Sequence, residues 1–296
     1  MSALAGKGLI VTPADVEAAL AEGGVRVIDC TVTFEVQPVG ASIIHSGRDH
    51  WLEGHVPGAA YLHMVDDLSD PAGTVPFTIA PQEQIEKALS RIGIEPGDTV
   101  VLYGAGTPIA VTRAWWVLDV SGVADVRIMD GGWRRWVAEG RPVATGEEIF
   151  VRTEFRGARR QDEIADRSMV LAALHDPDTM LLNALSPAQF EGSGGTHYGR
   201  PGRIPGSTSC PASDLLDPST GEFASLERMR ALLGATTADK KKIITYCGGG
   251  IAASTALFAL RLLGHRNLAL YDNSLLEWSA DPELPMESGP IGNGKP

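Results

Sequence analysis

The chain contains one pattern of apolar and polar runs twice, and this repeat constrains the fold more than any other feature. Asp29 of the first half matches Asn183 of the second at an offset of 154 residues, and Tyr103 matches Tyr246 at 143. The offset changes slowly, so the differences in length are confined to loops. A repeat of this kind is typical of a duplicated domain.

Strand-like runs alternate with helix-like runs in both halves, which predicts an α/β fold with a mainly parallel sheet covered by helices on both faces of each domain. We expect strands at 25–30, 125–132, 179–184 and 267–274, and strands that run into a glycine turn at 98–106 and 242–250. We expect helices at 82–94, 109–122, 225–234 and 251–264. The polar stretch 146–167 is the expected linker between two tandem domains at 1–145 and 168–296.

The charge pattern argues against two classes of partner. The chain has 37 acidic and 25 basic residues, a net charge of −12, and no basic block. Nucleic acids and anionic membranes both require clustered Lys and Arg, so we expect neither as a partner. No apolar stretch reaches the roughly 18 residues of a membrane span, and the amino terminus lacks the features of a secretory signal.

The cysteine and histidine spacings favour neither disulfides nor a metal site. Three scattered cysteines without a CxxC pair suit a reducing cytoplasm. Four histidines between residues 45 and 63 match no compact zinc pattern, so we expect no metal and no cofactor. His63, Asp66 and Asp67 follow the "GHVPGA" turn, where they are either solvated loop residues or face a cleft between the domains.

The run "ITYCGGGIAA" places Cys247 at the carboxyl end of an expected parallel strand, where open α/β sheets bind their ligands. Three glycines follow, and we expect them to curl the backbone with positive φ angles. The inward N–H groups and the helix dipole then favour a negatively charged sulfur. A buried Cys can also act as a small hydrophobic filler. The first half has Gly104 at the matching position, which favours one reactive and one inactive copy.

Five motifs carry a resemblance to a known family. In chain order they are "LEGHVPGAAYL" (52–62), "DGGWRRWVAEGRPV" (130–143), "GRPGRIPGSTSC" (199–210), "YCGGGIAAS" (246–254) and "YDNSLLEWSADPELPM" (271–286). With them the chain resembles the tandem-domain rhodanese sulfurtransferases over nearly its full length. The resemblance implies a catalytically inactive first domain and a reactive Cys247 in the second.

The resemblance also implies a ping-pong reaction with a covalent intermediate. Cys247 takes the outer sulfur of a small donor, becomes a persulfide, and passes the sulfur to cyanide, a thiol or a protein acceptor. A thioredoxin-like reductant is a candidate partner. The sulfur is expected to be stabilised by the active-site loop, which comprises Gly248, Gly249, Gly250, Ile251 and Ala252.

The loop sequence bears on the donor. Thiosulfate-type members of this family place basic residues after the cysteine, whereas mercaptopyruvate-type members have Cys-Gly-Ser/Thr-Gly-Val-Thr. "CGGGIA" lacks the basic pair, so 3-mercaptopyruvate is expected over thiosulfate. It also lacks hydroxyl groups at Gly249 and Ala252, so a proton relay through a serine at 249 cannot operate. A less usual thiol or thioketone donor stays open.

The second domain departs from the family where the donor is held. Many members read Asp-Ala-Arg where this chain has Asn183, Ala184 and Leu185, so a carboxylate and an arginine are lost. The nearby "THYGRPGRIPG" offers His197, Tyr198, Arg200 and Arg203 as replacements. We expect donor contacts from Arg200, His197 and Asn183, and a structural role for Arg203.

Competing functions fit the sequence less well. A phosphatase of related fold needs a longer loop closed by an arginine, but Ala253 stands six residues after the cysteine. A dinucleotide site needs a different glycine spacing and an acidic residue about twenty positions later. The alternative that remains is a non-catalytic sulfur carrier or a regulatory binding module of the same fold.

Overall fold

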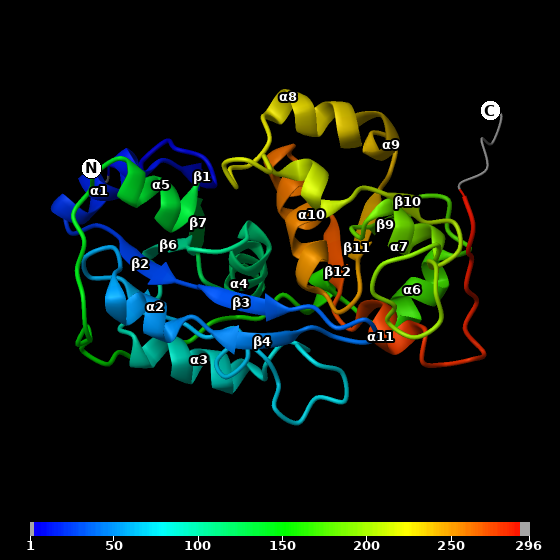
Figure 1. Ribbon diagram of the computed structural model, residues 1–296, viewed down its shortest axis with the longest axis horizontal. Helices are drawn as coiled ribbons and strands as arrows, with labels where there is room; N and C mark the ends of the chain where they lie inside the picture. Colours follow the sequence, from blue (N-terminus) through cyan, green and yellow to red (C-terminus); the bar gives the residue numbers. More distant parts are fainter. Residues whose placement is uncertain (1–2, 291–296) are drawn as a thin grey trace.

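The computed structural model describes residues 3–290 and has two five-stranded sheets in that range, each composed of parallel strand pairs. The first sheet has the order β1-β7-β6-β2-β5, with the bounds Ile10–Val11, Asp125–Met129, Thr99–Tyr103, Arg26–Asp29 and Ala60–Tyr61. The second has the order β8-β12-β11-β9-β10, with the bounds Ile164–Ala165, Leu268–Tyr271, Lys242–Tyr246, Thr179–Asn183 and Thr208–Ser209. The two α/β domains lie side by side (Figure 1).

The two sheets have the same topology, which confirms the duplicated fold predicted from the sequence. Even the register agrees: Asp29 pairs with Tyr103 in the first sheet, and Asn183 pairs with Tyr246 in the second. Each tyrosine hydroxyl also accepts the backbone N–H of the residue just before a "PGA" or "PGS" turn, Val56 for Tyr103 and Ile204 for Tyr246, at 3.1 Å.

Helices flank both sheets. In the first domain these are α1 to α5, with the bounds Pro13–Ala21, Arg48–Glu53, Gln82–Arg91, Pro108–Val120 and Gly132–Ala138. In the second they are α6 to α11, with the bounds Arg167–Ala173, Pro187–Glu191, Leu226–Met229, Ala235–Thr237, Ile251–Leu262 and Ser274–Trp278. Helix α8 continues through a π-helical turn at Arg230–Gly234 into α9, so the helix expected at 225–234 is longer than predicted. No helix within 3–290 has the length and apolar character needed to cross a bilayer.

The expected linker is partly built into the domains. Strand β8 lies inside 146–167 and pairs in parallel with β12, so the second sheet begins before residue 168. The side chain of Phe155, in the same stretch, is fully buried. The domain bounds at 145 and 168 stay predictions.

Helices α4 and α10 pack against each other in the middle of the molecule (Figure 1). Thr112 and Thr255 occupy matching positions in the two copies, and their hydroxyl oxygens lie 2.8 Å apart. The rings of Trp115 and Phe258 meet edge to face nearby. Contact between matching residues is what a local twofold axis produces, so the two loops that precede these helices approach the same interface.

A β-hairpin from the first domain reaches the second. Its strands, β3 (Val32–Glu35) and β4 (Ile43–Ser46), pair antiparallel, and Figure 1 shows the hairpin extending toward α11. At its tip the carbonyl of Pro38 accepts the N–H of His197, and the carbonyl of His197 accepts the N–H of Gly40. The first domain thus contacts the second at the segment around His197.

Candidate active site

Cys247 directly follows β11, as the sequence predicted, and α10 begins four residues later. Its backbone N–H donates to the hydroxyl of Ser274 at 3.0 Å, and its carbonyl accepts the N–H of Leu275 at 3.2 Å. The carbonyl of Gly248 accepts the N–H of Leu276 at 2.9 Å. The loop is therefore fastened to the start of α11.

The three glycines are required for two different reasons. Only Gly250 has a positive φ, at 78°, and a Cβ there would overlap the carbonyl oxygen of Asp272. The expectation of positive φ angles at Gly248 and Gly249 was wrong. A Cβ at Gly248 would overlap the ring of Tyr198, and one at Gly249 would lie 2.9 Å from Leu276 Cδ1. At these two positions glycine is needed because neighbouring side chains leave no room for a Cβ, and not because of the backbone conformation.

The loop offers unused hydrogen-bond donors. Among the described residues, the N–H groups of Gly248, Gly249 and Gly250 meet no acceptor. They lie at the amino-terminal end of the twelve-residue helix α10, whose dipole adds positive potential there. Backbone amides in this arrangement stabilise an anion such as a thiolate or a persulfide.

Cys247 lines a cavity of about 100 Å³ between the two domains. The walls are apolar and come from both domains: Phe34, Ala41, Phe77 and Ile109 from the first, and Leu185, Ile251, Ala252 and Leu276 from the second. Ser42 and Tyr198 supply the hydroxyl groups, and no acidic or basic side chain from residues 3–290 lines the cavity. The first domain thus forms half of the site around the cysteine.

Ser274 is a site residue that the sequence analysis missed. It is fully buried, has a φ of 49°, accepts the N–H of Cys247, and donates to the carbonyl of Tyr271 at 2.7 Å. The first copy has Gly132 at the matching position, with a φ of 52°. A non-glycine residue in this conformation costs energy and is enriched at functional sites. In the sequence, the sign of this role was that Ser274 stands where the first copy has glycine.

The side chain of Asn183 stabilises the end of its own strand and does not reach the cavity. Its side-chain oxygen accepts the N–H of Leu185 at 2.8 Å, just as Asp29 accepts the N–H of Thr31 at 2.7 Å in the first copy. Asn183 is fully buried and does not line the cavity. Leu185 does, so an apolar side chain stands where the family's arginine was expected.

The structure brings neither Arg200 nor His197 to Cys247. The guanidinium of Arg200 donates to the carbonyls of Ser279 at 3.0 Å and Asp281 at 2.6 Å, and His197 bonds through its backbone to the hairpin tip. Sequence spacing could not show these carbonyl partners, which lie about eighty residues further along the chain. Both residues hold the segment that contains Tyr198.

Tyr198, which stands between them, does line the cavity. The ring carbon that bears its hydroxyl is the atom nearest to the position of a Cβ on Gly248. Burial, and then the charge of nearby Cys247, raise the pKa of Tyr198 to about 12. The phenol therefore keeps its proton at neutral pH.

Arg203 takes the structural position expected for it. Its guanidinium lies 4.5 Å from the ring centre of Phe190 and pairs with Glu287 at 2.6 Å. In the first copy His55 stacks on Trp51 with ring centres 4.6 Å apart. The two copies thus use different residues for the same contact between a turn and a neighbouring helix.

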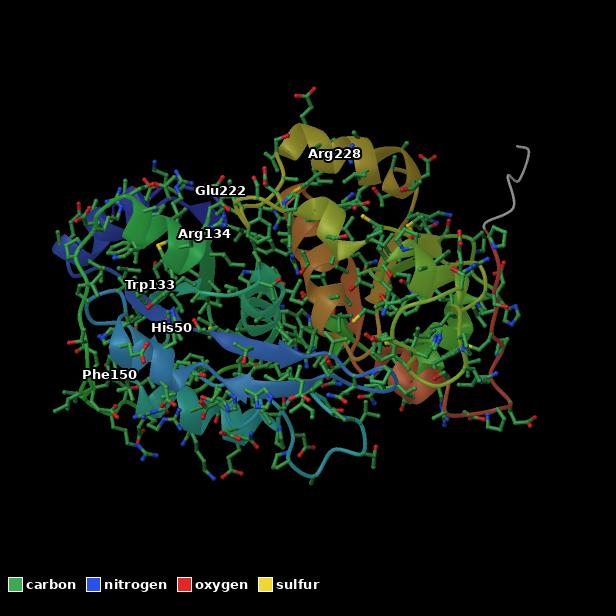
Figure 2. The ribbon with its side chains drawn as sticks, in the orientation of Figure 1. His50, Trp133, Arg134, Phe150, Glu222 and Arg228 are labelled. Atoms are coloured by element: carbon green, nitrogen blue, oxygen red, sulfur yellow. The ribbon has the colours of Figure 1, made fainter. Side chains whose placement is uncertain are left out.

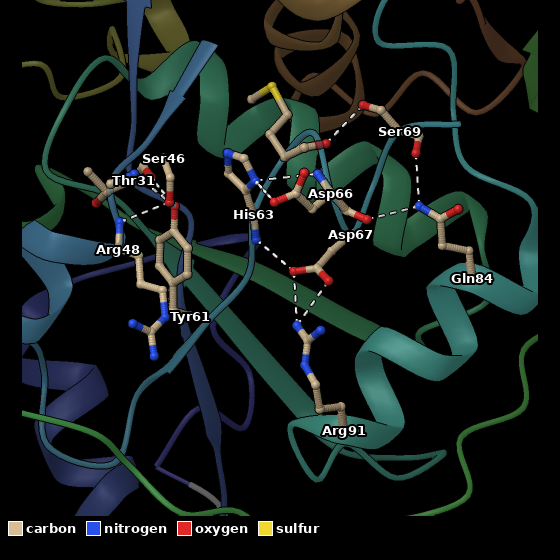
Figure 3. Close-up of polar contacts among 12 residues, drawn as sticks. Thr31, Ser46, Arg48, Tyr61, His63, Asp66, Asp67, Ser69, Gln84 and Arg91 are labelled. Atoms are coloured by element: carbon tan, nitrogen blue, oxygen red, sulfur yellow. Dashed lines mark hydrogen bonds and ion pairs between the residues drawn. The ribbon is translucent and has the colours of Figure 1, made fainter. Parts of the chain in front are cut away.

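His63, Asp66 and Asp67 belong to a polar cluster within the first domain (Figure 3). The His63 ring bonds to Asp66 at 2.8 Å, and Arg91 pairs with Asp67 at 2.9 Å. These residues line a separate crevice and not the cavity at Cys247. Among residues 3–290, no group of His, Cys, Asp or Glu is arranged to hold a metal ion.

The other two cysteines are buried in a different way. Burial raises the pKa of the Cys30 thiol well above its usual range and that of Cys210 to about 12. Neither lines the cavity. Since the thiolate is the reactive form, these two are structural and Cys247 is the candidate nucleophile.

A larger cleft of about 600 Å³ adjoins the cavity and shares Ile109, Leu185, Tyr198 and Ala252 with it. Figure 2 shows Arg134 and Glu222 where α5 of the first domain approaches the loop before α8. Arg134 donates there to the carbonyl of Ser219 at 2.8 Å and lines the cleft. Tyr198 therefore stands between the buried cysteine and a wider opening.

Known proteins match the chain in sequence and in structure. The family model described as "Rhodanese-like domain" matches residues 12–139 and 166–281. The "3-mercaptopyruvate sulfurtransferase" of Escherichia coli K12 is 28% identical over 264 residues, which cover 86% of this chain and 92% of that protein. The "Sulfur carrier protein TtuD" of Thermus thermophilus is 32% identical over 252 residues, covering 80% and 86%. The crystal structure of SseA from Escherichia coli matches with a TM-score of 0.76 at 23% identity, covering 90% and 99%.

Proposed function

The chain belongs to the rhodanese-like family, and from this premise we propose that it transfers a sulfane sulfur through a persulfide on Cys247. It is a sulfurtransferase of the 3-mercaptopyruvate or thiosulfate type. One observation carries the assignment of the nucleophile: Cys247 lies in a cavity between the domains, beside three amides without acceptors, at the position where the inactive copy has Gly104.

In the proposed reaction the Cys247 thiolate attacks the outer sulfur of the donor. A new S–S bond forms, and the bond between that sulfur and the rest of the donor breaks with its electron pair. The N–H groups of Gly248, Gly249 and Gly250 stabilise first the thiolate and then the persulfide anion. In the second half-reaction a nucleophilic acceptor takes the outer sulfur and regenerates the thiolate.

The cavity favours 3-mercaptopyruvate over thiosulfate as donor. Both are anions, but thiosulfate carries two charges and mercaptopyruvate one. The cost of desolvation rises steeply with charge, and none of the described residues places a cation at this cavity to offset it. The carboxylate of mercaptopyruvate would rely on the loop amides and on the hydroxyls of Ser42 and Tyr198. Cyanide, a small thiol or a thioredoxin-like protein is the proposed acceptor.

A second candidate function is a sulfur carrier or regulatory module that binds a partner protein without turnover. The similarity to a sulfur carrier protein favours it. The burial of Cys247, which is 2% exposed, favours small substrates instead.

The free state of all three cysteines fits a reducing compartment such as the cytoplasm.

The test is a sulfurtransferase assay on the purified protein with each donor and cyanide, in which thiocyanate is measured. We expect parallel double-reciprocal plots, as a ping-pong reaction requires, and no activity from Cys247→Ser. We expect a higher kcat/KM for 3-mercaptopyruvate than for thiosulfate. A thiosulfate preference of about tenfold or more contradicts the donor assignment. No thiocyanate from the wild-type protein favours the binding module.

A further inference from the structure

Tyr198 packs the hydroxyl-bearing half of its ring against the reactive loop. Its ring lies so close to Gly248 that only glycine is accommodated there, and the nearest ring atom is Cζ, the carbon that carries the oxygen. The next two atoms are Cε1 and Cε2, so the half of the ring that bears the hydroxyl packs against the residue next to Cys247. Tyr198 also lines the cavity that contains the thiol.

The backbone around Tyr198 is held on both sides. The residue before it, His197, pairs with Pro38 and Gly40 of the hairpin. The carbonyl of Tyr198 itself accepts the hydroxyl of Ser279 at 2.6 Å. Such fixed placement is what a group that acts on a reacting atom requires.

Within the part of the chain that the structure describes, Tyr198 is the one acidic group that lines the cavity besides the thiol. Ser42 is the other hydroxyl, and an aliphatic alcohol is a far weaker acid than a phenol. The position of the serine that could relay a proton, two residues after the cysteine, is occupied by Gly249. A proton needed at the donor must therefore come from elsewhere in the cavity.

Transfer from 3-mercaptopyruvate does need a proton. When the C–S bond breaks, its electron pair stays with the carbon skeleton as the enolate of pyruvate, which is a poor leaving group unless it is protonated. Thiosulfate differs, because its leaving group is sulfite, a stable anion that departs without a proton.

We propose that Tyr198 is the catalytic acid that protonates the leaving enolate when sulfur passes from 3-mercaptopyruvate to Cys247. This inference rests on the function proposed above. The Cys247 thiolate forms an S–S bond to the donor sulfur, the C–S bond breaks, and the Tyr198 hydroxyl gives its proton to the enolate oxygen. The tyrosinate then takes the proton of the terminal S–H. The products are the Cys247 persulfide anion and the enol of pyruvate, so atoms and charge balance.

The test compares Tyr198→Phe with the wild-type protein in the donor half-reaction alone. Sulfur loading of Cys247 is followed in single turnovers by mass spectrometry, with 3-mercaptopyruvate, thiosulfate and a small persulfide as donors. The phenylalanine keeps the ring against Gly248 and removes only the oxygen. We expect loading from mercaptopyruvate to slow by roughly 10²- to 10⁴-fold, the range of general acid catalysis.

The other two donors release sulfite or a thiolate, so their loading should change by less than about threefold. The control is Tyr271→Phe, which removes a phenol that bonds to Glu277 outside the cavity and should leave every rate unchanged. Equal losses for all donors, or no loss for mercaptopyruvate, would refute the role of Tyr198 but leave the proposed function standing. If no donor loads Cys247 in the wild-type protein, the proposed function fails and this inference with it.

Discussion

The buried ion pair between the domains offers a sharp test, in the substitution Asp272→Asn. Asp272 Oδ1 lies 2.5 Å from Arg113 Nη1, and Oδ2 accepts the N–H of Ile79 at 2.6 Å. The side chains are 1% exposed for Arg113 and 5% for Asp272. The amide keeps the shape of the carboxylate but leaves the guanidinium without its counter-charge.

Removing one partner of a buried ion pair costs about 3–5 kcal/mol. With about 2–4 °C of Tm for each kcal/mol in domains of 150–250 residues, the expected loss of Tm is on the order of 10 °C. Activity should fall as well. Arg113 also donates to the carbonyl of Phe77, which lines the cavity, and at 3.4 Å to that of Gly250 in the loop.

The duplication supplies the matched control, Asp130→Asn. Asp130 stands at the corresponding position of the first copy and accepts the N–H of Phe223 at 2.9 Å across the same interface. It is half-buried and has no buried arginine beside it, and the amide oxygen can still accept that bond. The expected cost is about 1 kcal/mol. The assay is thermal unfolding by calorimetry together with kcat/KM. A Tm for Asp272→Asn equal to that of Asp130→Asn would refute the reasoning.

Three further predictions concern packing, pH and reactivity. Gly248→Ala must push the ring of Tyr198 aside, so denaturant titration should show a loss of about 1–3 kcal/mol, accompanied by slower sulfur loading; an unchanged stability contradicts the contact. Burial raises the pKa of Asp29, so the folded chain keeps a proton that the unfolded chain releases, and stability falls as pH rises from about 4 through the folded-state pKa. Asp29→Asn should remove that part of the fall when unfolding is compared at pH 5 and 8. Iodoacetamide at pH 8 should label Cys247 and spare Cys210, whose pKa is raised to about 12, and equal labelling in a peptide map would contradict this.

The sequence was sufficient for the fold and for the place of Cys247 at the end of a parallel strand. The apolar runs and their order along the chain identify the strands. Because Cys247 stands between a parallel strand and the helix after it, it must lie at the carboxyl edge of the sheet. The missing side chain at Gly104 predicts, without any structure, that the second copy is the reactive one, and this stays a prediction. These inferences depend on short-range pattern and on the comparison of two copies, both of which can be read directly from the residues.

The contacts of the site could not be predicted in the same way. Arg200 has the right charge for a donor, but its hydrogen bonds go to backbone carbonyls that are brought near only by the fold. Phe34 reaches the cavity on a hairpin from the other domain, which no spacing rule indicates. Ser274 contributes to the site in a strained backbone conformation. Such strain depends on the course of the folded backbone and cannot be read from the residue type.

The central claim is that sulfur travels on Cys247, and intact-protein mass spectrometry after a brief exposure to 3-mercaptopyruvate tests it most directly. A gain of one sulfur atom is predicted, located on the peptide that contains Cys247, lost on addition of cyanide, and absent from Cys247→Ser. A protein that gains no sulfur, or gains it equally in the Cys247→Ser variant, would contradict the account.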